Sequence, residues 1–194
     1  MSSRVLVVAG KDRFGSQLLE EFSGNPGFAV AYDTSPSLSR LVKLIKRRAI
    51  PVKFLLLTLA CRLYTPPSRI RRFPEFRSAD ELLRMARAVG AEKILMFRVG
   101  QIIPPFLLEE FEVLNVHAAR LPEYRGLASI YRALSERNFS QQAVLHRATS
   151  SIDGGEIIAS RDFLLDDTES YCVNEKIAYG TAIQLIIDFL KEAE

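Results

Sequence analysis

Residues 4–33 read RVLVVAGKDRFGSQLLEEFSGNPGFAVAYD. The valine-rich run 4–9 predicts a buried strand that ends at a glycine. Apolar residues then recur at helical spacing until an Asn-Pro-Gly triplet breaks the pattern, and residues 28–32 predict a second strand. A strand, a helix and a strand in this order are typical of a parallel sheet with helices packed on its faces.

The rest of the chain extends this α/β pattern. A Ser-Ala-Asp-Glu capping box at 78–81 predicts the start of another helix, and a closing helix is expected over 177–190. Four more strands are predicted by short apolar runs: 93–97, 113–116, 142–148 and 156–163. The last two flank an Asp-Gly-Gly turn. We therefore expect a single domain, 1–194, with a Rossmann-like, mostly parallel sheet, helices on both faces, and a C-terminal β-hairpin and helix.

Basic residues are concentrated in one part of the chain. The formal net charge is +3, but residues 36–77 hold eleven Lys and Arg against the single acid Glu75, so this segment carries +10 and the rest −7. An apolar stripe and proline breaks predict a basic helical hairpin inserted at 36–72. Such a block attracts the phosphates of nucleotides, nucleic acids or lipids, although charge runs more commonly mark a solvated helix face.

Length and composition exclude several classes of protein. With 194 residues, 48% apolar and 25% charged, the chain is neither disordered nor a fibrous rod. No apolar run approaches the ~20 residues of a membrane span, and we see no signal-peptide pattern. Cys61 and Cys172 lie too far apart for a zinc motif, and they favour a reducing compartment. We therefore expect a cytoplasmic protein without a metal.

Three polar residues suggest chemistry. Asn115 and His117 end one predicted strand, and positions two apart on a strand project to the same side. Asp153, in the hairpin turn, would orient the His117 ring and stabilise its protonated form. Together they suit acyl transfer, because an imidazole can take a proton from an attacking amine while an amide N–H binds the developing oxyanion. We interpret His146, in mid-strand, as structural.

The first turn gives a weaker signal. It has neither the G-x-G-x-x-G nor the P-loop pattern. Asp33 ends the second strand, where dinucleotide folds hold a ribose, but a tight strand-to-helix turn is the simpler interpretation. The turn can still face a ligand, because parallel sheets bind ligands at the carboxyl ends of their strands.

Four spaced motifs resemble one family. They are GQIIP at 100–104, NVH at 115–117, LPEYRG at 121–126 and IDGGEII at 152–158. The last three are similar to the signature of folate-dependent formyltransferases, N-[IV]-H-x-S-L-L-P-x-[YFW]-[RK]-G followed by a D-x-G turn, and the first resembles that family's G-x-[IL]-[IL]-P loop. The family includes formyltransferases that act on glycinamide ribonucleotide, methionyl-tRNA and sugar nucleotides. The resemblance is continuous over about residues 94–158.

The resemblance implies a reaction and its residues. A formyl group would pass from 10-formyltetrahydrofolate to a primary amine, with no metal. Asn115 would stabilise the oxyanion, His117 would assist proton movement, and Asp153 would support His117 and position a water. The folate would be held by Gln101, Ile102, Ile103, Pro104 and Ile152. The acceptor would be held by Gly10, Lys11, Arg125 and Gly126.

Departures from the family pattern bear on the acceptor. Ala119 and Arg120 replace the usual Ser-Leu, which changes the pocket wall. The first turn reads GKDRFG rather than the G-N-G-S-N phosphate loop of purine-pathway members, and the chain stops soon after its last predicted helix, without the β-domain of the tRNA enzymes. We therefore expect a small, phosphate-bearing amine, above all an amino sugar on a nucleotide, and no nucleic-acid partner.

Alternatives stay open on the sequence alone. The acceptor could be glycinamide ribonucleotide or another small amine. The chain could also be a non-catalytic Rossmann-like module that docks on anionic surfaces through the insert. A peripheral membrane contact of that insert and the oligomeric state are both undetermined.

Overall fold

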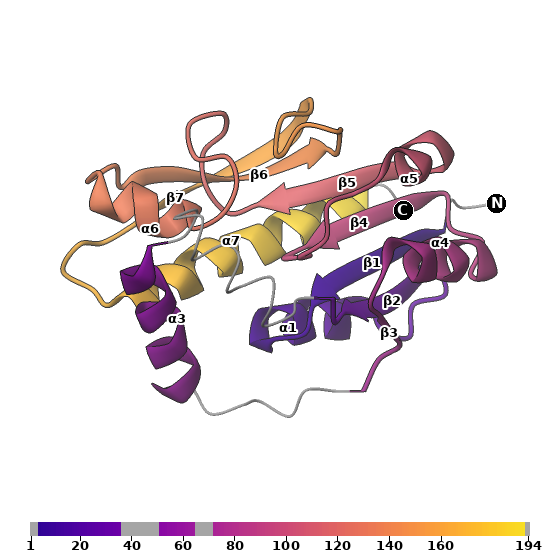
Figure 1. Ribbon diagram of the computed structural model, residues 1–194, viewed down its shortest axis with the longest axis horizontal. Helices are drawn as coiled ribbons and strands as arrows, with labels where there is room; N and C mark the ends of the chain where they lie inside the picture. Colours follow the sequence, from indigo (N-terminus) through magenta and orange to yellow (C-terminus); the bar gives the residue numbers. More distant parts are fainter. Residues whose placement is uncertain (1–3, 36–50, 65–71, 193–194) are drawn as a thin grey trace.

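A computed structural model describes residues 4–35, 51–64 and 72–192. In this part of the chain, a mixed sheet of seven strands has the order β3-β2-β1-β4-β5-β6-β7 (Figure 1). The strands are β1 (Val5–Gly10), β2 (Phe28–Asp33), β3 (Glu75–Phe76), β4 (Lys93–Phe97), β5 (Glu112–His117), β6 (Ser140–Arg147) and β7 (Ile157–Leu164). The pairs from β3 to β5 are parallel, and those joining β5 to β6 and β6 to β7 are antiparallel. The predicted α/β fold is confirmed.

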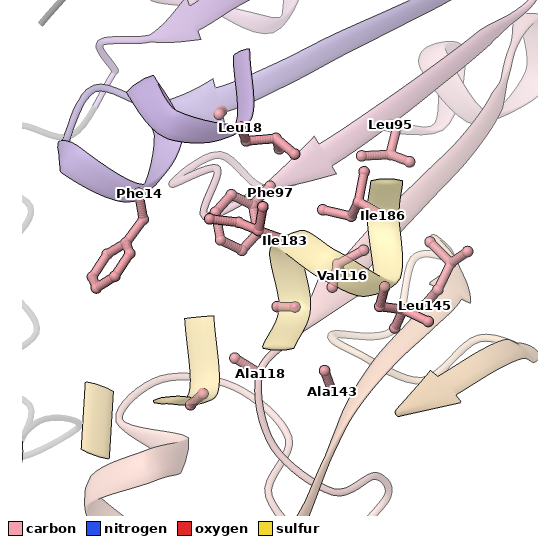
Figure 2. Close-up of a cluster of buried hydrophobic side chains, with 14 of the residues drawn as sticks. Phe14, Leu18, Leu95, Phe97, Val116, Ala118, Ala143, Leu145, Ile183 and Ile186 are labelled. Atoms are coloured by element: carbon pink, nitrogen blue, oxygen red, sulfur yellow. The ribbon is translucent and has the colours of Figure 1, made fainter. Parts of the chain in front are cut away.

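Helices cover both faces of this sheet. They are α1 (Arg13–Phe22), α3 (Val52–Tyr64), α4 (Ala79–Ala88), α5 (Pro105–Glu110), α6 (Ser129–Ser135) and α7 (Tyr171–Glu192). One buried cluster joins α1 and α7 to the sheet, and its members include Phe14, Phe97, Val116 and Ile186 (Figure 2). A second cluster packs α4 and α5 on the other face. Alternate β1 residues enter the two clusters, because successive strand side chains point to opposite faces.

Local sequence signals explain where some elements begin. Ser78 caps α4, its hydroxyl accepting from the N–H of Glu81 at 3.2 Å, and the Glu81 carboxylate accepts in return from the N–H of Arg77 at 2.6 Å. The closing helix begins at Tyr171, earlier than predicted. The prediction missed its first turns because the buried polar Asn174 interrupts the apolar periodicity there. The Asn174 side chain hydrogen-bonds the backbone of Asp166.

The predicted insert is only partly within the described residues. Its first helix falls outside them, whereas α3 corresponds to its second helix. Cys61 of α3 and Cys172 of α7 form a disulfide with a Cα–Cα distance of 5.3 Å. The disulfide contradicts our interpretation of these cysteines as a sign of a reducing compartment. The two cysteines are 111 residues apart in sequence, but α3 meets the beginning of α7 in space (Figure 1). Among the described helices, none has both the length and the apolarity that crossing a membrane requires.

Candidate active site

The site lies at the carboxyl end of β5, where the sheet changes from parallel to antiparallel pairing. Strand β5 delivers Asn115 and His117 to a cavity of about 740 Å³. Antiparallel pairing with β6 sets His146 opposite Asn115. The turn between β6 and β7 adds Asp153 to the same cavity wall.

The three predicted catalytic residues meet there. Asn115 Nδ2 donates to Asp153 Oδ1 at 3.3 Å, and Asp153 Oδ2 lies 3.3 Å from His117 Nδ1. Asp153 Oδ2 also accepts from the N–H of Gly126 at 2.8 Å. One carboxylate thus connects an amide, an imidazole and the loop between β5 and α6.

Backbone geometry places this carboxylate. Asp153 has a φ of 46°, in the left-handed region, which Asp adopts more readily than most residues. A Cβ on Gly155 would overlap the carbonyl oxygen of Arg147, so the turn packs directly against the end of β6. Gly126 also has a positive φ, of 79°. Glycine at 155 therefore lets the turn pack closely, and glycine at 126 permits the left-handed backbone of its loop.

His146 belongs to this network, so its interpretation as purely structural was incomplete. It is 2% exposed, and its Nε2 lies 3.1 Å from Asn115 Nδ2 and 3.6 Å from Asp153 Oδ1. Its Nδ1 lies 2.9 Å from the carbonyl of Arg147. Because that carbonyl can only accept, Nδ1 carries a proton, and in the tautomer with this single ring proton Nε2 accepts from Asn115. Only the register of β6 against β5 could have revealed this.

Burial and charge set the protonation of the central pair. Burial alone would raise the pKa of Asp153, but His146 and His117, when their rings are protonated, and the N–H of Gly126 lower it to about 2. Burial lowers the pKa of His117, although the charge of Asp153 and the Tyr124 carbonyl oppose that shift. At neutral pH the site therefore holds an ionised carboxylate beside a neutral His117.

The neutral His117 has one favourable tautomer. Its Nε2 lies 2.8 Å from the carbonyl oxygen of Tyr124, which can only accept, so Nε2 carries the proton. Nδ1 is then the atom where a second proton can be added, and the resulting cation would face Asp153 Oδ2. Asp153 is thus placed to stabilise a proton on Nδ1, against the burial that disfavours it.

The residues that the resemblance assigns to the folate fall mostly on the cavity wall. Gln101, Ile102, Ile103 and Ile152 line it, whereas Pro104 lies outside it, at the N-cap of α5. The Nε2 of Gln101 is buried and has no hydrogen-bond partner in the described part of the chain. Ile102 and Ile152 are 70% and 63% exposed, an apolar pair at the rim. The wall thus offers an unused donor and apolar contacts to a planar heterocycle.

The residues assigned to the acceptor are more scattered. Gly126 lines the cavity, but Arg125 is exposed and lies outside it. Lys11 forms an ion pair with Glu75 at 2.6 Å, away from the cavity wall. A Cβ on Gly10 would come within 2.7 Å of the Arg98 carbonyl oxygen, so Gly10 packs against the backbone of Arg98 rather than facing a ligand.

The N-terminus of α1 is occupied by the protein itself. Asp12 Oδ1 accepts from the N–H groups of Phe14 and Gly15, both at 3.0 Å. Asp12 Oδ2 accepts from Arg98 Nε and Nη2, each at 2.8 Å. The positive end of a helix is a common anion site, and here a carboxylate of the chain fills it.

Arg98 lines the cavity from the end of β4. Its guanidinium lies 3.9 Å from the centroid of the Tyr179 ring, and its backbone has a φ of 57°.

The described residues contain no group of three or more His, Cys, Asp or Glu side chains that could hold a metal ion.

Comparison with known proteins places this chain in a family. The formyl transferase family model matches residues 5–178. The methionyl-tRNA formyltransferase of Listeria monocytogenes is 28% identical over 163 residues, covering 77% of this chain and 50% of that protein. That of Rickettsia rickettsii is 27% identical over 165 residues, covering 75% and 50%. This chain thus spans about half the length of the curated relatives it matches.

Solved structures share the fold. A phosphoribosylglycinamide formyltransferase from Streptococcus pneumoniae has a TM-score of 0.66 at 17% identity, covering 99% of this chain and 98% of that one. A sugar N-formyltransferase from Shewanella has a TM-score of 0.66 at 16% identity, covering 100% and 70%. At such identities the likeness shows the fold alone.

Proposed function

Because this chain belongs to the formyl transferase family, we propose that it transfers a formyl group from 10-formyltetrahydrofolate to the primary amine of an amino sugar carried on a nucleotide. The observation that supports this most directly is the meeting of Asn115, His117 and Asp153 on the wall of one cavity. These are the groups that acyl transfer to an amine requires.

The cavity suits the proposed donor. Its volume of about 740 Å³ lies in the range of sites for medium-sized organic ligands. The unpaired Nε2 of Gln101 would hydrogen-bond the polar edge of the pterin, and Ile102 and Ile152 would cover its faces. When bound, 10-formyltetrahydrofolate supplies an activated formyl carbonyl.

The chain's own residues would manage the proton and the charge. His117 would take a proton at Nδ1, and the ionised Asp153 would stabilise the resulting cation. Both N–H groups of the Asn115 amide are engaged, one by His146 and one by Asp153. To bind an oxyanion, Asn115 would have to release one of these bonds.

The first turn supports a sugar acceptor over glycinamide ribonucleotide. A terminal phosphate at the N-terminus of α1 would meet the Asp12 carboxylate, which already uses the N–H groups of Phe14 and Gly15 and pairs with Arg98. Two anions at one helix end repel each other. A sugar ring can enter the cavity while the diphosphate of its nucleotide stays outside this turn.

The test is a direct assay. The protein is incubated with 10-formyltetrahydrofolate and a panel of nucleotide-linked amino sugars, with glycinamide ribonucleotide included, and products are followed by mass spectrometry. We expect formylation of at least one amino sugar, and Asn115→Ala should slow it by about 10²–10³. Gln17→Ala, which removes an exposed amide of α1, is the matched control. No turnover across the panel together with no folate binding would refute the proposal.

A further inference from the structure

Helix α3 packs against α6 and α7 through one narrow face. Phe54 and Cys61 lie seven residues apart, two helical turns, and therefore point to the same side. The Phe54 ring packs 5.9 Å from that of Tyr131 in α6 and 6.1 Å from that of Tyr171 in α7. The opposite face exposes three large apolar side chains, Val52, Leu56 and Leu59. The described contacts thus attach α3 along one stripe, beside the first turns of α7 (Figure 1).

That stripe includes a covalent bond. Cys61 is 2% exposed and is joined to Cys172, the second residue of α7. Its neighbour Tyr171 contacts Phe54, and both rings line the cavity. The disulfide therefore fixes the turn of α7 that supports Phe54.

Besides β5, β6 and the segment 126–130, two further groups of elements line the cavity. Loops after β4 and β6 contribute Gln101 and Ile152, which the proposed function assigns to the folate. Helices α3 and α7 contribute Phe54, Tyr171 and Tyr179. Since donor and acceptor must both reach His117, an acceptor that enters beside the folate can contact this aromatic wall. Aromatic faces suit the apolar face of a sugar ring or a nucleobase.

We propose that Phe54 is a specificity-determining residue for the acceptor and that the Cys61–Cys172 disulfide holds it against the cavity. This inference rests on the proposed function for the identity of the acceptor. A dithiol reductant would cleave the S–S bond, forming two cysteine thiols while the dithiol becomes a disulfide. Phe54 would then leave the wall with α3, and acceptor binding would weaken while donor binding would not.

The first experiment needs no turnover. Alkylation without reductant, followed by mass spectrometry, should find both cysteines protected, and dithiothreitol should release both. Hydrogen exchange of residues 51–61 should accelerate on reduction, while β1 and β4 stay protected. Free thiols in the unreduced protein, or unchanged exchange after complete reduction, would overturn the tether.

The second experiment measures kinetics with the acceptor found in the panel assay. Reduction should raise the acceptor KM by about tenfold, as expected for the loss of one aromatic wall contact, and change the donor KM less than twofold. Phe54→Ala should raise the acceptor KM similarly. The matched control is Leu56→Ala, on the exposed face of the same helix. A Cys61→Ser/Cys172→Ser variant should no longer respond to dithiothreitol.

The outcomes separate the two proposals. If folate binds and turnover occurs but the acceptor KM does not change on reduction or in Phe54→Ala, the wall assignment is wrong and the proposed function stands. If no folate binds and no amine is formylated, the proposed function and the acceptor role of Phe54 both fail. In that case hydrogen exchange still decides whether the disulfide holds α3.

Discussion

Replacing Asp153 with asparagine tests the electrostatics of the site with little change in shape. Asparagine tolerates the φ of 46° at this position and keeps an oxygen for the N–H of Gly126. The substitution removes the charge and replaces the oxygen that accepts from Asn115 Nδ2 with an NH2 group. Because the folded-state pKa of Asp153 is about 2 and the ordinary value is 3.8, folding favours the ionised form by about 2 kcal/mol. A depressed pKa contributes stability that is present above pH 3.8 and is lost as the pH falls toward 2.

The assay is urea unfolding of wild type and Asp153→Asn at pH 6, 5, 4 and 3. The linkage relation predicts that the wild-type advantage shrinks by about 1 kcal/mol between pH 6 and pH 3, with the remainder lost below pH 3. Asp167→Asn, which removes an exposed ion pair with Arg137, should change stability by less than about 0.5 kcal/mol. A difference between wild type and Asp153→Asn that is the same at pH 6 and pH 3 would refute the claim that folding favours the ionised carboxylate.

Three further substitutions test the surroundings of that carboxylate. His146→Gln should lower kcat by about tenfold with the acceptor KM unchanged, because Asn115 loses the acceptor that orients it. Gly155→Ala should destabilise the protein by at least about 2 kcal/mol in urea, because its Cβ overlaps a carbonyl oxygen of β6, whereas Gly27→Ala meets only ordinary contact. His117→Gln should flatten the fall of Tm on acidification below about pH 6.5, because a His with a lowered pKa makes the folded state bind fewer protons than the unfolded chain.

Each of these predictions can fail. A normal kcat in His146→Gln would mean that Asn115 is oriented without it. Equal stability of the two glycine variants would mean that the turn does not rest on β6. A Tm that falls as steeply in His117→Gln as in wild type would assign the acid sensitivity to other groups.

Much of the fold was predictable because buried helices and strands place their apolar residues at regular spacings in the sequence. The predicted strand 93–97 matches β4, and its residues 94–97 are apolar on both faces, as is typical of a central parallel strand. Strand β3, Glu75–Phe76, is too short to produce a pattern, and it forms only because it pairs with β2. Helix α7 begins six residues before its predicted start because Asn174 and Glu175 are buried polar residues.

The motifs placed Asp153 and most of the residues assigned to the folate at this site, and strand spacing placed two more of its residues there. Asn115 and His117 share β5, so their spacing placed them together. His146 enters through the antiparallel register of β6, and Cys61 meets Cys172 only because α3 lies beside α7. These are contacts between segments distant in sequence, and no local pattern encodes them.

The charge balance of the site bears on how it can accept an amine. Asp153 is ionised, while the depressed pKa of His117 leaves its ring neutral at neutral pH. The carboxylate therefore attracts a protonated amine, but only a neutral amine has the lone pair that acyl transfer needs. Moving the amine's proton to His117 Nδ1 creates a cation 3.3 Å from Asp153 Oδ2, so the site as a whole becomes neutral. The burial that lowers the pKa of His117 thus keeps Nδ1 free of a proton at neutral pH, and Asp153 offsets part of the cost of protonating it when the proposed acceptor amine enters.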